Sequence, residues 1–230
     1  MEAHSDGAAF DELRAAEPSP ARVDAIRNRI AGELRPVRPL PSNRALASAL
    51  TAAFICLGVA CAIPIRLKGY YAMTKAQMLA DCAAILLCAF VLAFRLAQEI
   101  VPGAPPKRVS AASLVAAGFA VMAATTALLF PDYSTAQFVQ KGLRCLTIGT
   151  LCAIPAAGLL WRVMRLGMLT DRASGLVTAA ALAGMVGVFT LALHCPILTA
   201  AHILAWHLTV PALALASVVL FIRRPRIPTA

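Results

Sequence analysis

Residues 174–193 read SGLVTAAALAGMVGVFTLAL and contain no charged side chain. A helix that crosses a bilayer needs about 20 predominantly apolar residues, and this stretch has that length. Five further apolar runs of similar length, separated by short polar segments, lie at 45–66, 76–97, 109–130, 144–163 and 202–222. We therefore predict an all-α integral membrane bundle of six transmembrane helices.

The overall composition agrees with a membrane protein. Hydrophobic residues make up 60% of the chain, charged residues make up 14%, and the mean hydropathy is +0.76. A soluble domain of this length would have to expose a large apolar surface. The chain is thus expected to consist of a cytoplasmic N-terminal arm at 1–44, a six-helix transmembrane domain at 45–222 and a cytoplasmic tail at 223–230.

The distribution of basic residues predicts the orientation in the membrane. The first 44 residues lack the apolar core of a cleavable signal peptide, so the first span is expected to be an uncleaved signal anchor. With six spans, the arm, the tail and the second and fourth connections lie on one side of the membrane, and the first, third and fifth connections lie on the other. The first side has 16 of the 21 Lys and Arg residues, and the second side has 5. Because basic residues favour the cytoplasmic side, both termini are predicted to be cytoplasmic. The net charge of +10 then indicates contact with anionic lipid headgroups and no direct nucleic-acid binding.

The arm contains an amphipathic helix. Ser19 followed by Pro20 is typical of an N-cap and a first helical turn. After it, apolar residues recur at spacings of three and four, at Val23, Ile26, Ile30 and Leu34. The arm has too few large apolar side chains to cover this stripe with a core of its own, so the stripe must bind a partner, lie on the bilayer or stay partly disordered. The prolines of residues 35–41 predict an extended spacer to the first span.

The chain lacks the common catalytic motifs. It has no Walker loop, no Gly-x-Gly-x-x-Gly after a strand, no His-Glu-x-x-His and no nucleophile elbow. The connections between the spans are too short to form an additional domain. We therefore expect that the protein is not an enzyme, and that its function resides in the arm or within the bundle.

Two of the seven cysteines occupy corresponding positions. Cys145 begins the fourth span, and Cys195 follows the fifth span within His194-Cys195-Pro196. A short connection joins these spans, so the chain returns to nearly the same depth on the outer side. Because the helices of a tight hairpin are neighbours, the two thiols can come within reach of a disulfide; the alternative is that each is an unpaired cysteine at the membrane interface. Four others are assigned to helix packing: Cys56, Cys61, Cys88 and Cys152.

Asp81 and three histidines are further candidates on the outer side. A carboxylate within a span is costly and therefore a functional candidate, although Asp81 could also reach water or pair with Lys75. His194, His202 and His207 lie at the end of the fifth span and along the sixth. Histidines on facing helices can bind haem, and histidine together with cysteine can bind zinc or copper. The alternative is hydrogen bonding within the bundle or at the headgroups.

An ordered set of segments resembles one known family. The set comprises RPVRPLP at 35–41, FRL at 94–96, VPG at 101–103, Cys145, ALHCP at 192–196 and Trp206-His207. Together with the six spans, it is similar to the NrsF-type membrane anti-sigma factors over residues 22–222. In this chain the residues Gln98-Glu99-Ile100 separate FRL from VPG more widely than the family pattern does.

The resemblance implies that the protein holds an extracytoplasmic-function sigma factor inactive at the bacterial inner membrane and releases it under metal or oxidative stress. It places the sensing function on Cys145 and Cys195, and His194, His202 and Asp81 are candidates for supporting them. The apolar stripe of the arm would then bind the sigma factor. No resident cofactor is expected, although Cys145, Cys195 and His194 would bind a heavy-metal ion transiently.

Two other functions stay open from the residues alone. A haem- or metal-binding membrane electron-transfer subunit would depend on the three histidines, and a small transporter would depend on Asp81. A stoichiometric haem absorption band in the purified protein would favour the first. A transporter needs polar residues on several helices, and the spans offer few besides Thr125, Thr126, Thr147 and Thr150.

Overall fold

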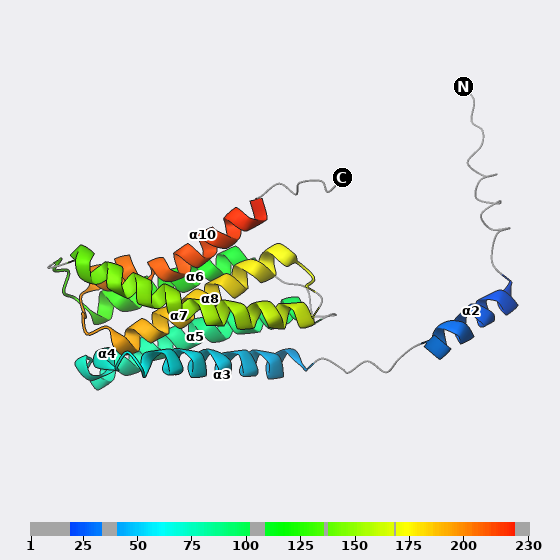
Figure 1. The fold of residues 1–230 in the computed structure, drawn as a ribbon, viewed down its shortest axis with the longest axis horizontal. Coiled ribbons are helices and arrows are strands. Elements are labelled where there is room, and N and C mark those ends of the chain that lie inside the picture. The colour runs from blue at the N-terminus through cyan, green and yellow to red at the C-terminus, as the bar shows by residue number, and fades with distance from the viewer. Residues whose placement is uncertain (1–18, 34–40, 102–108, 136–137, 168, 224–230) are drawn as a thin grey trace, which may run out of the picture. The chain divides into compact units, whose positions relative to one another are not determined.

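The computed structural model describes residues 19–33, 41–101, 109–135, 138–167 and 169–223. Within these ranges the regular elements are all helical and there is no β-strand. The helices are α2 (Pro20–Glu33), α3 (Asn43–Ala62), α4 (Lys68–Ala72), α5 (Lys75–Ile100), α6 (Ala111–Leu129), α7 (Phe138–Leu166), α8 (Arg172–His194), α9 (Ala200–His202), η1 (Ile203–His207) and α10 (Thr209–Arg223) (Figure 1). The chain forms two units, residues 1–40 and residues 41–230, and each is described by itself.

Six helical segments of the second unit are long and apolar enough to cross a membrane. They are α3, α5, α6, α7, α8 and the run from α9 through η1 to α10. The predicted all-α chain with six such segments is therefore confirmed for the described residues. Its insertion in a membrane and its orientation stay predictions.

The helix boundaries differ from the predicted spans by one to six residues, and three of the differences have a clear reason. The first helix ends at Ala62 instead of residue 66, because Pro64 cannot continue an α-helix. The fourth begins at Phe138 instead of residue 144, because the helix includes polar first turns that a search for apolar runs leaves out. The second extends through Gln98-Glu99-Ile100, so these three residues form the last turn of α5.

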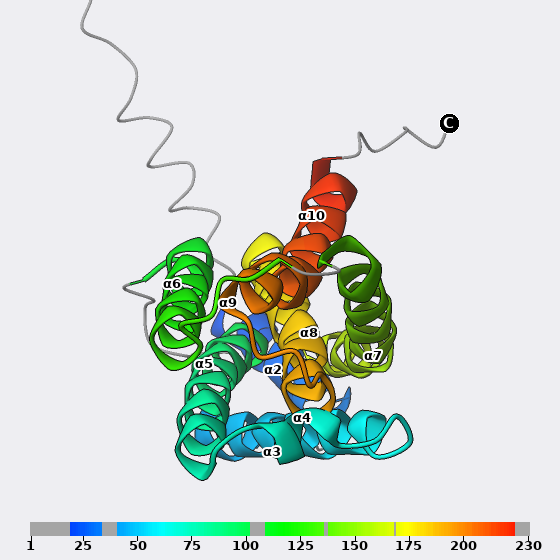
Figure 2. The ribbon, with the colours of Figure 1, turned by 90° about the vertical axis from the view of Figure 1, so that its left-hand side faces the viewer.

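Helix α8 is the centre of the bundle. In the most apolar 18-residue stretch of α8, 89% of the residues are buried. The corresponding share is 11–44% in the other five segments. Figure 2 shows α8 surrounded by its neighbours, with α3, α5, α6, α7 and α10 packed around it. Small residues permit this packing: a Cβ atom on Gly187 would collide with the carbonyl group of Gly149 in α7, and one on Gly184 would collide with Pro211 in α10. Such close backbone contacts are typical of helices that pack in lipid.

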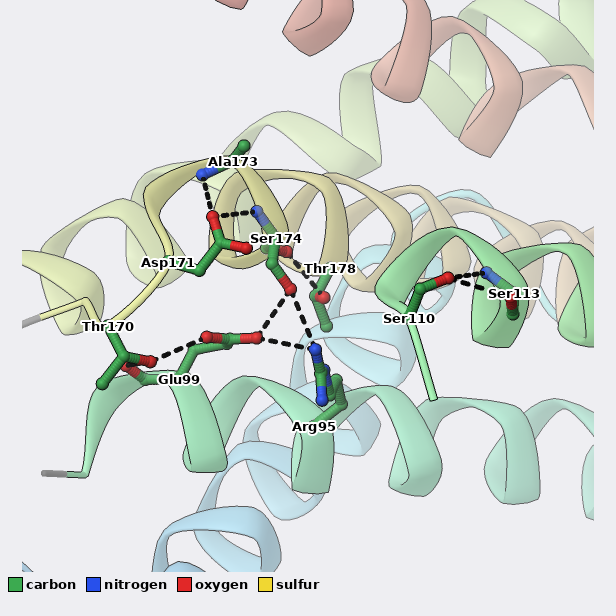
Figure 3. Close-up of polar contacts among 9 residues, drawn as sticks. All are labelled: Arg95, Glu99, Ser110, Ser113, Thr170, Asp171, Ala173, Ser174 and Thr178. Carbon is green, nitrogen blue, oxygen red and sulfur yellow. Dashed lines mark hydrogen bonds and ion pairs between the residues drawn. The ribbon is translucent and has the colours of Figure 1, made fainter. Parts of the chain in front are cut away.

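A buried ion pair within α5 is hydrogen-bonded to the start of α8. Arg95 Nη2 lies 3.0 Å from Glu99 Oε1, and the side chain of Glu99 is fully buried (Figure 3). The Ser174 hydroxyl donates to Glu99 Oε1 at 2.6 Å, and the Thr170 hydroxyl donates to Glu99 Oε2 at 3.0 Å. Asp171 caps α8 by accepting from the backbone N–H groups of Ala173 and Ser174. The network therefore joins the C-terminus of α5 to the loop between α7 and α8.

The opposite end of the bundle, which we call the α4 end, holds the C-terminus of α8. The N-termini of α7 and α9 lie at the same end (Figure 1). Gly69 of α4 packs directly on the end of α8, since a Cβ atom there would lie 2.6 Å from the carbonyl oxygen of Ala192 and 2.7 Å from that of Cys195. The backbone N–H of Ala200 donates to the carbonyl oxygen of Asp132 at 2.7 Å. Contacts from α4 and from the residues after α6 thus hold the segment that follows α8.

The first unit contains α2, which begins at Pro20 as predicted. The backbone N–H of Arg22 donates to the Ser19 hydroxyl at 3.4 Å. Val23, Ile26 and Ile30 are 38%, 50% and 53% exposed, so the described part of the apolar stripe is uncovered. Leu34 and the proline-rich spacer lie outside the described residues, as do residues 224–230 of the tail.

Candidate functional site

The structure brings Cys145 and Cys195 together at the α4 end. Cys145 lies in the first turns of α7, and Cys195 is the residue at which α8 ends. Their Sγ atoms are 3.4 Å apart, and both side chains are buried as free thiols. The matched depth expected from the short connection between the two helices therefore becomes a direct contact between the thiols.

Two histidines of the last span face the thiols because the helix widens between them. The backbone N–H of Leu208 donates to the carbonyl oxygen of Ile203, five residues earlier, and η1 is a π-helix. In a regular α-helix, residues five apart point about 140° away from each other. The wider turn instead places the rings of His202 and His207 edge to face, with centroids 5.4 Å apart. Such π-helical turns are frequent at functional sites.

Cys145, Cys195, His202 and His207 form one cluster, which we call the Cys2His2 cluster. One side-chain nitrogen or sulfur of each residue lies within 4.8 Å of those of the other three, and all four residues are buried. The Cys195 sulfur lies 3.5 Å from Nε2 of His202. Nε2 of His207 is buried and makes no hydrogen bond to the described residues.

The cluster favours the thiolate form of Cys195, which lies just beyond the end of α8. The hydrogen bond from the Cys145 thiol lowers the pKa of the Cys195 thiol, and the rings of His202 and His207 act in the same direction against the opposing effect of burial. The thiolate is the form of cysteine that reacts with oxidants and binds metal ions. The arrangement therefore suits a reactive thiol more than a cysteine that only fills space.

Asp81 belongs to the same region. It is 5% exposed, so it does not reach water as an interface residue would. It interacts electrostatically with His207. Asp81, Cys195 and His207 line one cavity of about 10 Å³, which is the space of roughly one water molecule. That size leaves no room beside the histidines for a porphyrin, so the geometry favours a small ligand over haem.

His194 lies outside the cluster. Its Nδ1 donates to the carbonyl oxygen of Arg66 at 2.9 Å, and Arg66 has a left-handed backbone with φ of 73°. Sequence reasoning grouped His194 with the two cysteines because it precedes Cys195 directly. The structure groups His207 with them instead, and the sequence pattern carries no signal for the π-helix that positions it.

Most of the remaining residues singled out from the sequence have packing contacts, but Cys56, which was also assigned to packing, is exposed. Cys88 lies against Gly118, and Cys152 of α7 lies beside Cys61 of α3. Trp206 packs on Phe138, with ring centroids 5.4 Å apart, and covers Gly142. The sequence reasoning missed the Glu99 network, whose signal was a charged pair four residues apart near the end of a span.

The fold and this site define a class of protein: a bundle of six long apolar helices with a pair of thiols at one end. The model of the family described as NrsF, negative regulator of sigma F, matches residues 30–225. Because this match covers most of the chain, the protein belongs to that family, and membership implies negative regulation of a sigma factor. No curated protein and no solved structure matches the chain.

Proposed function

We propose that this protein is an anti-sigma factor of the bacterial inner membrane, which binds an extracytoplasmic-function sigma factor through α2 and releases it when metal or oxidant modifies Cys145 and Cys195. The observation that carries the proposal is the 3.4 Å separation of the two Sγ atoms. Two buried thiols in contact, beside a histidine, are the arrangement from which either a disulfide or a metal thiolate forms with little movement.

Modification of the thiols would act on the packing of α7 and α8. A peroxide would oxidise one thiol to a sulfenic acid, which would condense with the other to a disulfide and release water. The new bond would tie the start of α7 to the end of α8. It would favour release of the sigma factor only if the modified pair is more stable in the releasing arrangement than in the holding one.

Helix α8 is suited to carry such a change along the bundle. Its C-terminus ends at Cys195, and its N-terminus is held by the hydrogen bond from Ser174 to Glu99. Because its sides are packed closely against Gly149 and Pro211, α8 would shift as a unit more readily than it would deform. A rearrangement at the α4 end would therefore reach the opposite end, where the arm is predicted to join the first span.

The arm supplies the proposed binding surface. An amphipathic helix with an uncovered apolar stripe is a common ligand for a groove in a folded partner. The exposed Ile26 and Ile30 are the largest apolar side chains of the described stripe. We place the sigma factor contact there.

Replacing Ile26 and Ile30 by Asp is expected to release the sigma factor without any stress. Burying an isoleucine side chain contributes about 1.5–3 kcal/mol, so losing both should weaken binding by at least ~100-fold. A sigma-dependent reporter and co-purification with the sigma factor measure the effect. The matched control is Ala25→Asp with Asn28→Asp, which adds the same charge on the opposite face of the helix. Unchanged binding by the Ile26 and Ile30 variant would place the binding surface elsewhere.

Reporter fusions test the proposed orientation. Because the Lys and Arg residues are distributed 16 to 5, a fusion after Ala230 should be active with a cytoplasmic reporter and inactive with periplasmic alkaline phosphatase. A fusion after Asp132 in the third connection should give the opposite result. Phosphatase activity at Ala230 would contradict six spans with both termini in the cytoplasm.

A further inference from the structure

We infer that the Cys2His2 cluster is a binding site for a divalent d10 ion of the Zn²⁺ and Cd²⁺ class, held by Cys145, Cys195, His202 and His207. The site would extend the proposed function. Only the claim that the bound ion acts as a signal rests on that function. Binding itself is a property of the purified chain.

The spacing of the four side chains matches tetrahedral coordination. With metal–sulfur bonds of about 2.3 Å and metal–nitrogen bonds of about 2.0–2.1 Å, two sulfur ligands of one ion lie about 3.8 Å apart, and a sulfur and a nitrogen lie about 3.6 Å apart. The observed separations are 3.4 Å between the two Sγ atoms and 3.5 Å between Cys195 Sγ and His202 Nε2. Small side-chain movements would therefore complete the coordination sphere.

The fourth ligand is indicated by a buried ring nitrogen that has no hydrogen-bond partner among the described residues. His207 is 4% exposed, and its Nε2 makes no hydrogen bond to the described residues. A buried polar atom without a partner is destabilising. A metal ion would remove that effect. Asp81 interacts with the same ring, and a carboxylate beside a metal-binding histidine commonly orients the ring and strengthens its bond to the ion.

The charge of the cluster selects a divalent ion. When the ion binds, the two thiols release their protons to solvent and become thiolates, while the two imidazoles bind as neutral rings. A divalent ion with two thiolates is neutral as a unit. A neutral unit avoids the large desolvation cost of a net charge at a site where all four residues are buried. Thiolate and imidazole ligands also favour Zn²⁺ and Cd²⁺ over Mg²⁺ and Ca²⁺, which prefer oxygen ligands.

The bound ion would join three elements that are separate in the chain. Cys145 belongs to α7, Cys195 ends α8, and in the last span His202 precedes the π-helical turn and His207 ends it. One ion would thus fasten the last span to the hairpin of α7 and α8. A disulfide would link that hairpin alone, so metal and oxidant would change the same site in different ways.

The test uses the full-length protein, purified in detergent, reduced with a phosphine and dialysed against Zn²⁺ or Cd²⁺. We expect one ion per chain. X-ray absorption of the wild-type protein loaded with Zn²⁺ should give two sulfur neighbours at about 2.3 Å and two nitrogen neighbours at about 2.0–2.1 Å. This measurement needs no variant, so it does not depend on the folding of one. A shell of oxygen atoms, or of sulfur alone, would overturn the inference, as would the absence of a bound ion.

A pair of histidine variants then tests which ring takes part. His207→Ala should weaken binding by more than ~100-fold, since loss of an outer-shell partner alone costs 10–100-fold. His194→Ala is the matched control. It removes a histidine that is next to Cys195 in the sequence, but the His194 ring is hydrogen-bonded to the carbonyl oxygen of Arg66 and lies outside the cluster. The control should bind like the wild type. Equal binding by the two variants would remove His207 from the site.

The binding measurement and the sigma-dependent reporter separate the two proposals. If the four ligands bind the ion but the cysteine variants still respond to cadmium in cells, the proposed sensing function fails and the metal site stands. If the cysteine variants lose the response but the purified chain binds no ion, the metal site fails and the thiol sensor stands.

Discussion

Cys145→Ser and Cys195→Ser are each expected to keep the sigma factor bound and to abolish its release by cadmium or peroxide. Coupling between linked sites is typically about 1–3 kcal/mol, which corresponds to roughly 5- to 150-fold in affinity. A variant that lacks one thiol cannot form the disulfide and loses one of the two thiolate ligands of the proposed metal site, so this factor should be lost. The double variant should behave like either single one, because the two thiols act as a unit. The measurement is a sigma-dependent reporter with and without stress.

Cys152→Ser provides the matched control for this experiment. Cys152 also lies in α7 beside another cysteine, Cys61 of α3, but it lies about two helical turns after Cys145 and is not one of the four cluster residues. Its variant should respond normally. A normal response in the double variant of Cys145 and Cys195 would reject the thiol sensor. Constitutive release would instead mean that the reduced pair helps to hold the sigma factor.

Glu99→Ala is expected to destabilise the bundle by about 3–5 kcal/mol, the usual cost of leaving one partner of a buried ion pair without the other. The substitution would leave the Arg95 guanidinium, 8% exposed, without its carboxylate. It would also remove the acceptor of the Ser174 and Thr170 hydroxyls. Thermal unfolding of the purified protein in detergent, followed by circular dichroism, measures the effect.

The control for this prediction replaces both charges, with Arg95→Met and Glu99→Leu in one chain. Apolar residues of similar size leave no unpaired buried charge, so the double variant should be clearly more stable than Glu99→Ala. If Glu99→Ala unfolds like the wild type, the Glu99 carboxylate is not what stabilises the contact between α5 and α8. If the double variant is as unstable as the single one, lost packing is the cause, and the role of charge is rejected.

Much of the fold was predictable because a helix that could cross a membrane meets simple criteria of length and composition. A spanning helix must be about 20 residues long and apolar, so the six segments could be located from hydropathy alone. Their ends were less predictable, as the start of α7 at Phe138 illustrates, because a helix continues through polar residues as long as nothing breaks it. Cys145 and Cys195 were predicted to lie at nearly the same depth because each residue of a helix advances the chain by a fixed distance along the axis. That distance does not depend on neighbouring side chains.

The sequence by itself determined that the chain is helical, that six segments have membrane-spanning length, and that Cys145 and Cys195 lie at one end of a hairpin. Only the tertiary structure decided that His207 joins them and His194 does not. The reason is local geometry: a π-helical turn brings His202 and His207 to one face, whereas a regular helix would place them about 140° apart. Likewise, only the tertiary structure paired Glu99 with Ser174, 75 residues apart in the chain. A buried charge needs polar partners, and the packing of the helices decides which residues lie close enough to supply them.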